Sequence, residues 1–240
     1  MALNTQRLDR FICGYKQVSR KHVRLILAQN RVYVDGYLAK DMAQLVNQFS
    51  VVVLDGVVVQ QQCAYYIMLN KPSGVVCATK DKQHKTVIDL LTDDYEKNII
   101  DQLHIVGRLD LNTSGMVLLT NDSQWSKWLT SPLSKIPKCY EVLLESPITH
   151  EYIDAFAKGM FFSYEDITTQ PAQLRILSSH RAEVILTEGR YHQIKRMFGR
   201  FRNKVIALHR LSIGGLQLDN KLLSGQSRRL TEGELKIIKT

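Results

Sequence analysis

The chain of 240 residues lacks several features that mark cofactor-dependent enzymes. Its four cysteines, Cys13, Cys63, Cys77 and Cys139, are scattered and form no Cys-x-x-Cys pair. This pattern argues against a zinc site or a disulfide framework, and it fits a reducing cytoplasm. No Gly-x-Gly-x-x-Gly follows a strand-like run, and no P-loop is present, so no nucleotide or methyl-donor site is indicated. We therefore expect a protein that needs neither a metal ion nor another cofactor.

Long apolar runs are also missing. The apolar runs, such as residues 51–54, are far shorter than the roughly 20 residues that span a bilayer. Residues 1–7 lack the apolar core of a signal peptide. We expect a cytoplasmic protein that works as a monomer and does not bind a membrane.

Positive charge is what the chain has in surplus. It holds 32 Lys and Arg against 23 Asp and Glu, a formal net charge of +9. Such a surplus favours a polyanionic partner, most simply nucleic acid, with an anionic membrane as the weaker alternative. With 45% hydrophobic residues the chain can bury a core, as one large domain or as one domain plus a small module.

The first sixty residues have the pattern of a small separate module. We predict one helix over residues 7–15 and a second from the N-cap Ser19 to about residue 30. Strand-like runs follow at 31–34 and 49–54, and Asp35-Gly36 and Asp55-Gly56 are turn signals. Two helices followed by a small sheet, with a basic helix face, resemble the S4-type RNA-binding domain.

The basic face of this module is the reason to consider RNA. Residues 1–60 hold eight Lys and Arg against four acids, and four of these cations should gather on one side: Arg20, Lys21, Arg24 and Arg31. A solvated helix face is the alternative interpretation. We favour RNA binding because the module is too small for an obvious catalytic pocket.

The polar run at residues 60–62 predicts a linker, which gives domains 1–60 and 61–240. The second domain mixes helices and strands without strict alternation, so we expect an α+β fold with a mostly antiparallel central sheet. Strands are predicted at 66–69, 105–106, 116–120, 138–144, 171–177 and 182–186, and helices at 86–91, 123–129, 149–158 and 191–198.

The most informative motif is Gly107-Arg108-Leu109-Asp110. An apolar lead-in ends at this motif, and a small-residue turn separates it from the next apolar run. A carboxylate and a guanidinium are thus offered at a tight turn between two buried strands, where catalytic groups often lie. From the spacing alone, a surface ion pair would be the simpler interpretation.

This motif resembles the signature of pseudouridine synthases, and the chain is similar to the branch that modifies bacterial ribosomal RNA. The resemblance implies that Asp110 is the catalytic residue. Tyr140, in Lys138-Cys139-Tyr140-Glu141-Val142, matches the active-site Tyr of the family. Lys195, which follows His192-Gln193-Ile194, matches the basic residue that pairs with the catalytic carboxylate. Residues 69–74 match the first family motif, in which Lys71 could contact phosphate.

Residues 189–210 form a second basic stretch without a single acid. Its seven cations could neutralise RNA phosphates, and the interleaved aromatic residues could stack on unpaired bases. The cations are Arg190, Lys195, Arg196, Arg200, Arg202, Lys204 and Arg210. The complete set of predicted RNA contacts is Arg20, Lys21, Arg24, Arg31, Lys71, Arg190, His192, Gln193 and Arg196.

The resemblance also implies a reaction. A uridine would be flipped out of the RNA, with Arg108 bracing the vacated space and Tyr140 stacking on the uracil. Asp110 would attack the sugar or remove a sugar proton, and the residues leave both options open. The expected substrate is 16S ribosomal RNA, at uridine 516, within an assembling small subunit.

Three alternatives stay open at this point. The enzyme could act on 23S ribosomal RNA instead. The chain could be a non-catalytic ribosome-assembly factor with a degenerate synthase fold, although the intact set of Asp110, Tyr140 and Lys195 argues against that. It could also be an RNA methyltransferase with an S4-type module, but a glycine-rich cofactor loop is missing.

Overall fold

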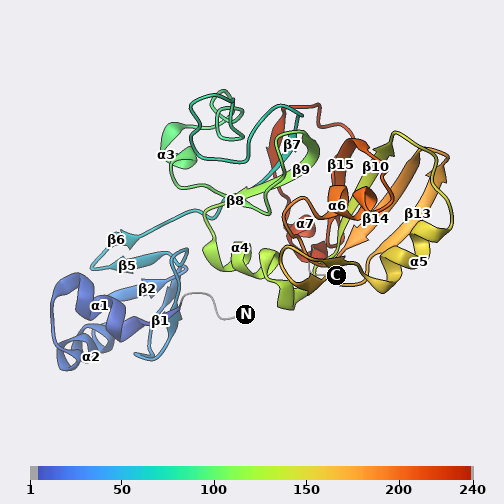
Figure 1. Ribbon diagram of the computed structural model, residues 1–240. Helices are drawn as coiled ribbons and strands as arrows, with labels where there is room; N and C mark the ends of the chain where they lie inside the picture. The colour runs from blue at the N-terminus through green and yellow to red at the C-terminus, as the bar shows by residue number, and fades with distance from the viewer. Residues whose placement is uncertain (1–4, 239–240) are drawn as a thin grey trace. The chain divides into compact units, whose positions relative to one another are not determined.

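The computed structural model describes residues 5–238, so part of the stretch that we compared with a signal peptide lies outside the described residues. The chain forms two compact units, Met1–Ala64 and Tyr65–Thr240 (Figure 1). Within residues 5–238, no helix is long and apolar enough to cross a membrane. The two units are described separately below.

The first unit packs two helices on a small antiparallel sheet (Figure 1). The sheet order is β3-β2-β5-β6, and β1 pairs with β4 beside it. The elements are β1 (Gln6–Arg7), α1 (Leu8–Lys16), α2 (Arg20–Ala28), β2 (Val32–Val34), β3 (Tyr37–Leu38), β4 (Leu45–Val46), β5 (Val52–Leu54) and β6 (Val57–Gln60). The two predicted helices and both predicted strands of this unit are thereby confirmed within one or a few residues at each end.

Local chemistry explains these elements. The Ser19 hydroxyl accepts a hydrogen bond from the His22 N–H and caps α2, as predicted. Val23, Ile26 and Leu27 are buried because their spacing places them on one face of α2. Each predicted Asp-Gly turn joins two strands with both residues at positive φ, for example 56° at Asp55, which matches a tight hairpin.

The linker begins one residue later than the polar run suggested. Gln60 is the last residue of β6, and its side-chain amide donates to the carbonyl oxygens of Asn47 and Ser50. The prediction of Gln60 as linker is therefore wrong, because its amide is tied into the first unit. The connection between the two units begins after it.

The second unit is built around a nine-stranded sheet, ordered β13-β14-β10-β15-β9-β7-β17, with β16 paired to β15 and β8 to β9. Its strands are β7 (Tyr66–Lys71), β8 (His104–Val106), β9 (Thr113–Thr120), β10 (Lys138–Leu144), β13 (Gln173–Ser178), β14 (Arg181–Leu186), β15 (Val205–Ile213), β16 (Leu216–Gln217) and β17 (Ser227–Arg229). β9 and β15 run parallel, while the other described pairs of this sheet are antiparallel. The predicted α+β class with a mostly antiparallel sheet is confirmed.

Helices and a small hairpin complete this unit (Figure 1). They are α3 (Lys97–Ile100), α4 (Ser123–Thr130), the 3-10 turn Pro132–Ser134, α5 (Glu151–Lys158), the hairpin β11 (Phe161–Phe162) and β12 (Ile167–Thr168), α6 (Gln193–Gly199) and α7 (Glu232–Ile237). Phe156 of α5 and Phe198 of α6 are fully buried in one core cluster with β10, β13, β14 and β15. That cluster holds α6 against the sheet.

Two expectations about this unit fail. Residues 86–91 are not a helix: Thr86 bridges to Val76, and Thr86 and Asp89 exchange reciprocal hydrogen bonds that close a single turn. β15 was not predicted at all, because its N-terminal half lies inside the basic stretch. It is nevertheless a central strand, paired with both β10 and β9.

The parallel contact between β9 and β15 depends on one glycine. Gly115 has φ of +104°, and a Cβ at this position would lie 2.3 Å from the carbonyl oxygen of Arg210. Only a residue without a side chain allows the two backbones to approach this closely. Gly115 therefore fixes the position of β15 relative to the loop that precedes β9.

Candidate active site

Asp110 lies in the loop between β8 and β9, within the motif that the sequence singled out. Leu109 is buried, whereas Arg108 on one side is exposed and Asp110 on the other is half-buried. The N–H of Leu109 donates to the sulfur of Cys77 at 3.3 Å. The loop is thus anchored at its middle residue and presents its two charged neighbours.

Lys71 holds the same loop through hydrogen bonds to backbone carbonyl groups. It is fully buried, and its ammonium donates to the carbonyl oxygens of Pro72 at 2.8 Å, Leu111 at 3.2 Å and Thr113 at 2.7 Å. Burial lowers the pKa of Lys71 from its ordinary value. The prediction that Lys71 contacts phosphate is wrong, because its three donors are used inside the protein.

Arg210 is a second buried cation that holds the loop. Its Nε donates to the carbonyl of Met116 at 2.7 Å, and one terminal nitrogen donates to the carbonyl of Gly107 at 2.6 Å. The other terminal nitrogen lies 3.4 Å from the Tyr140 hydroxyl. Arg210 is only 2% exposed, so its predicted role in neutralising phosphate is wrong. It joins β9, the Gly107 turn and Tyr140 instead.

Two nitrogen-bearing side chains face the Asp110 carboxylate from the start of α6. Lys195 Nζ lies 3.6 Å from Asp110 Oδ2, and His192 Nε2 lies 3.4 Å from the same oxygen. The residues are three positions apart, a spacing that places side chains on one side of a helix. His192 is the N-cap of α6 with φ of +50°, and its ring stacks on Tyr191. The pairing of Lys195 with Asp110 is therefore present, and His192, predicted only as an RNA contact, also reaches the carboxylate.

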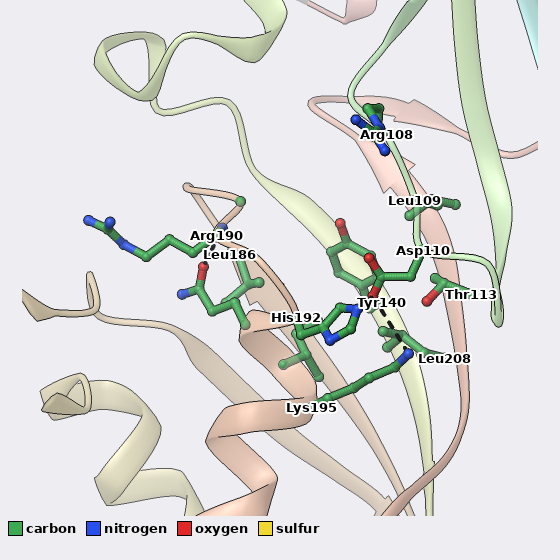
Figure 2. A pocket seen from close by; sticks show the side chains of 13 residues that line it. Arg108, Leu109, Asp110, Thr113, Tyr140, Leu186, Arg190, His192, Lys195 and Leu208 are labelled. Atoms are coloured by element: carbon green, nitrogen blue, oxygen red, sulfur yellow. Dashed lines mark hydrogen bonds and ion pairs between the residues drawn. The ribbon is translucent and has the colours of Figure 1, made fainter. Parts of the chain in front are cut away.

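These groups surround a cleft of about 480 Å³. Figure 2 shows His192 and Lys195 reaching toward Asp110, with the ring of Tyr140 beside the carboxylate. The cleft has a charged rim and an apolar floor, and is lined by Arg108, Leu109, Asp110, Thr113, Tyr140, Leu186, Gly189, Arg190, His192, Gln193, Ile194, Lys195 and Leu208.

The two arginines at the rim differ in their surroundings. The Arg108 side chain lies at the far end of the cleft from Lys195, turned away from Asp110 (Figure 2). Arg190 extends away from Asp110 (Figure 2), and its Nε pairs with Glu188 at 2.9 Å. Both are exposed, so both are accessible to an RNA that enters the cleft.

Two other residues that were predicted to contact RNA, Gln193 and Arg196, make side-chain contacts within the protein. Gln193 is 3% exposed, and its amide donates to Glu188 and accepts from the Arg190 N–H. Arg196 forms a two-point ion pair with Glu165 and stacks on the Phe162 ring. The prediction that Gln193 binds RNA directly is wrong, because its side chain is buried and bonded within the loop that carries His192. Arg196 is half-buried and paired with Glu165, and its contact with RNA stays a prediction.

Of the four residues in the first unit that were predicted to contact RNA, two make ion pairs with other residues of the described chain and two do not. Lys21 and Arg24 on α2 are exposed. Arg20 lies 3.4 Å from buried Asp9, and Arg31 pairs with Asp55. The Arg31 and Lys16 side chains hold the pKa of Asp55 at about 2. Lys21 and Arg24 are thus the cations with the fewest competing contacts.

The described residues hold no group of three or more His, Cys, Asp or Glu side chains that could bind a metal ion. The chemistry that the cleft offers is that of one carboxylate beside a lysine ammonium, an imidazole and an aromatic ring. Such a carboxylate can act as a nucleophile or as a general base.

Comparison with known proteins decides between the classes of enzyme that could use such a carboxylate. The sequence model of the family described as RNA pseudouridylate synthase matches residues 65–199. The chain belongs to the RNA pseudouridylate synthase family. The match covers β7 through α6 and so includes Lys71, Asp110, Tyr140 and Lys195. The chain is therefore assigned as a pseudouridine synthase.

Curated relatives match almost the whole chain. A protein of Pseudomonas aeruginosa named ribosomal small subunit pseudouridine synthase A is 47% identical over 95% of this chain and 98% of its own length. A protein of the same name from Escherichia coli is 41% identical over the same shares. A solved structure described as a pseudouridylate synthase is 35% identical, covers 99% of this chain and 100% of its own, and has a TM-score of 0.69.

Proposed function

We propose that this pseudouridine synthase isomerises one uridine of 16S ribosomal RNA, uridine 516, in the assembling small subunit. The observation that carries the activity is the Asp110 carboxylate, which Lys195 and His192 approach through one oxygen beside Tyr140. The relatives named for the small subunit, at 47% and 41% identity along nearly the full chain, support the choice of RNA.

The isomerisation needs no net change of atoms. The N1–C1′ bond of uridine breaks, the base rotates, and a C5–C1′ bond forms; C5 loses a proton and N1 gains one. Asp110 starts the reaction by attacking C1′ or by removing a proton from the sugar. In either route the carboxylate must be oriented toward the sugar. The contacts of Oδ2 with Lys195 and His192 orient it and leave Oδ1 for the substrate.

The target base must leave its stack before the sugar can reach Asp110. Tyr140 supplies a ring on which the uracil stacks, and Arg108 at the exposed rim braces the space that the base vacates. Arg190, also exposed, contacts the RNA backbone. Tyr140 is held in turn by Arg210, so the stacking surface and the catalytic loop are parts of one hydrogen-bonded network.

The first unit acts in this proposal as an S4-type RNA-binding domain that docks the enzyme on ribosomal RNA. Its two helices on a small sheet, and exposed Lys21 and Arg24 on α2, support that assignment. One chain carries every group of the candidate site, so a monomer suffices. Work on an assembling ribosomal subunit takes place in the cytoplasm.

Pseudouridine mapping tests this proposal. Carbodiimide-dependent primer extension is performed on 16S and 23S RNA from cells with the protein, without it, and with the Asp110→Asn variant. We expect one 16S site to disappear without the protein and to return with the wild type but not with Asp110→Asn. Loss of a 23S site instead would refute the small-subunit assignment while leaving the chemistry in place.

A further inference from the structure

A second groove adjoins the active-site cleft and shares Lys195 and Leu208 with it. Figure 2 shows Lys195 and Leu208 on the opposite side of Asp110 from Arg108. The groove has about 1230 Å³ of free space and runs past the C-terminal end of α6 along the start of β15. It is lined by Asn112, Lys195, Gly199, Arg202, Asn203, Lys204, Val205, Ile206, Ala207 and Leu208.

An irregularity in β15 turns an apolar side chain into this groove. On β10, Leu143 and Leu144 are adjacent, but their partners on β15 are Ala207 and Val205, so Ile206 is an extra residue. Such bulges redirect side chains and are common beside active sites. Ile206 is consequently 52% exposed, in a strand whose later residues are largely buried.

The same part of β15 also leaves one backbone edge open. The pairing of β15 with β9 begins at Leu208 opposite Thr113, and β16 pairs only with Ser212 and Ile213. In the part of the chain that the structure describes, residues 205–207 therefore have a strand neighbour on the β10 side alone. Free peptide groups at such an edge can bond to a ligand lying along it.

The charged residues that line the groove are all basic. Arg202 and Lys204 are exposed and make no ion pair within residues 5–238, and Lys195 stands at the junction with the cleft. No acidic residue lines the groove or occurs anywhere between positions 189 and 210. The groove therefore offers cations, an exposed apolar side chain and free backbone groups side by side.

We propose that this groove binds the unpaired RNA strand that flanks the target uridine. The inference rests on the proposed function, because it takes the flipped nucleotide to lie at Asp110. Arg202 and Lys204 contact phosphates, Ile206 contacts a base face, and the Asn112 amide and the open edge of β15 supply polar contacts. Unpaired RNA presents both phosphates and unstacked bases to such groups, whereas a paired helix hides the faces of its bases.

A protein strand that adds to the open edge of β15 is the competing occupant. The unbroken positive charge of the groove favours the polyanion. The groove also continues from Lys195, so a strand that places one nucleotide at Asp110 leads into it without crossing another element of the described chain. This continuity links the groove to recognition of the sequence around the target.

The test compares the wild type with the double variant Arg202→Gln, Lys204→Gln. Each is given a small-subunit RNA fragment with the unpaired flank of the target and one in which that flank is removed. Dissociation constants are measured over a series of salt concentrations, and kcat and KM are measured at one. A double variant of two exposed cations outside the groove, Lys127→Gln with Lys158→Gln, is the matched control.

We expect the double variant to reduce the magnitude of the salt slope by about 1.4, which corresponds to two lost single-strand phosphate contacts. KM rises while kcat stays within about twofold, and the loss disappears on the RNA without the flank. Ile206→Asp, which changes an exposed side chain, gives the same dependence on the flank and guards against misfolding of the double variant.

Unchanged binding and KM in the groove variants, or an equal loss on both RNAs, would overturn the proposal. The proposal would also be overturned if a peptide strand bound in the groove without any effect on RNA binding. If the wild type forms no pseudouridine in this fragment, the proposed function is what fails. The salt dependence of binding still tests the groove in that case.

Discussion

At the scale of single residues, the catalytic loop is held by two buried cations that bind backbone oxygens. Lys71 donates to three carbonyls around the loop, and Arg210 donates to those of Gly107 and Met116. Neither role could be predicted from the sequence, since both residues lie in motifs where an exposed cation would contact phosphate. Asp110, Tyr140 and Lys195 could be predicted, but only through the family motif.

We predict that Arg210→Met lowers the free energy of unfolding of the second unit by about 2–4 kcal/mol, because two buried carbonyls lose their donors. The value of kcat should fall, since Tyr140 and the Gly107 turn lose a common anchor, while RNA affinity stays within about twofold. Denaturation followed by tryptophan fluorescence measures the stability, because Trp125 and Trp128 both lie in α4 of this unit. A large loss of RNA affinity with normal stability would instead indicate a direct RNA contact.

The stability of the first unit depends on pH through Asp55. The Arg31 and Lys16 side chains lower the pKa of Asp55 from 3.8 to about 2. The stabilisation is therefore fully present above about pH 4 and is lost as the pH falls through about 2. We expect Asp55→Asn to destabilise this unit at pH 6, and the difference from the wild type to shrink below pH 4. Amide hydrogen exchange in β2 and β5 measures it, and a difference that is constant with pH would contradict the account.

At the scale of elements, the sequence predicted regular elements better than irregular ones. The apolar spacing of α2 and the cap at Ser19 identified that helix, because both signals are local. Residues 86–91 had apolar residues at helical spacing but form one closed turn, because Asp89 satisfies the Thr86 N–H after a single turn. β15 was missed because its N-terminal half lies inside the basic stretch, and its pairing with β9 is a tertiary contact that depends on Gly115.

We predict that Gly115→Ala destabilises the second unit by about 3 kcal/mol or more, because the new Cβ combines a backbone clash with strained φ. Activity should be lost together with stability, since β15 carries Arg210. Gly199→Ala is the control, because nothing lies within 4 Å of its added Cβ and its backbone is helical. It should change stability by less than about 1 kcal/mol. Equal stability of the Gly115→Ala protein and the wild type would show that the strands can separate at no cost.

At the scale of the whole molecule, the net charge of +9 favoured a polyanionic partner, in agreement with the RNA pseudouridylate synthase family, but it did not show which cations are engaged within the protein. Arg20, Arg31, Arg196 and Arg210 are engaged within the protein. The exposed cations include Lys21 and Arg24 on α2, Arg108 and Arg190 at the rim of the cleft, and Arg202 and Lys204 just before β15. In the proposed function the two units divide the work, with docking on the first and chemistry on the second.

We predict that Lys21→Glu with Arg24→Glu raises the dissociation constant for small-subunit RNA at least tenfold at low salt and leaves kcat at saturating RNA within about twofold. The reason is that both side chains are exposed on α2, far along the chain from the residues of the cleft. Filter binding and single-turnover kinetics measure the two quantities. A fall in kcat with unchanged affinity would contradict the division of work.

The most direct test of the account is the Asp110→Asn variant of the full chain, assayed for pseudouridine formation and RNA binding with one small-subunit RNA. The substitution keeps the size of the side chain and removes the charge that Lys195 and His192 approach. We predict no product above background in a single turnover, with a dissociation constant within about threefold of the wild type. Product formation by Asp110→Asn at a rate near that of the wild type would contradict the central claim that this carboxylate performs the chemistry.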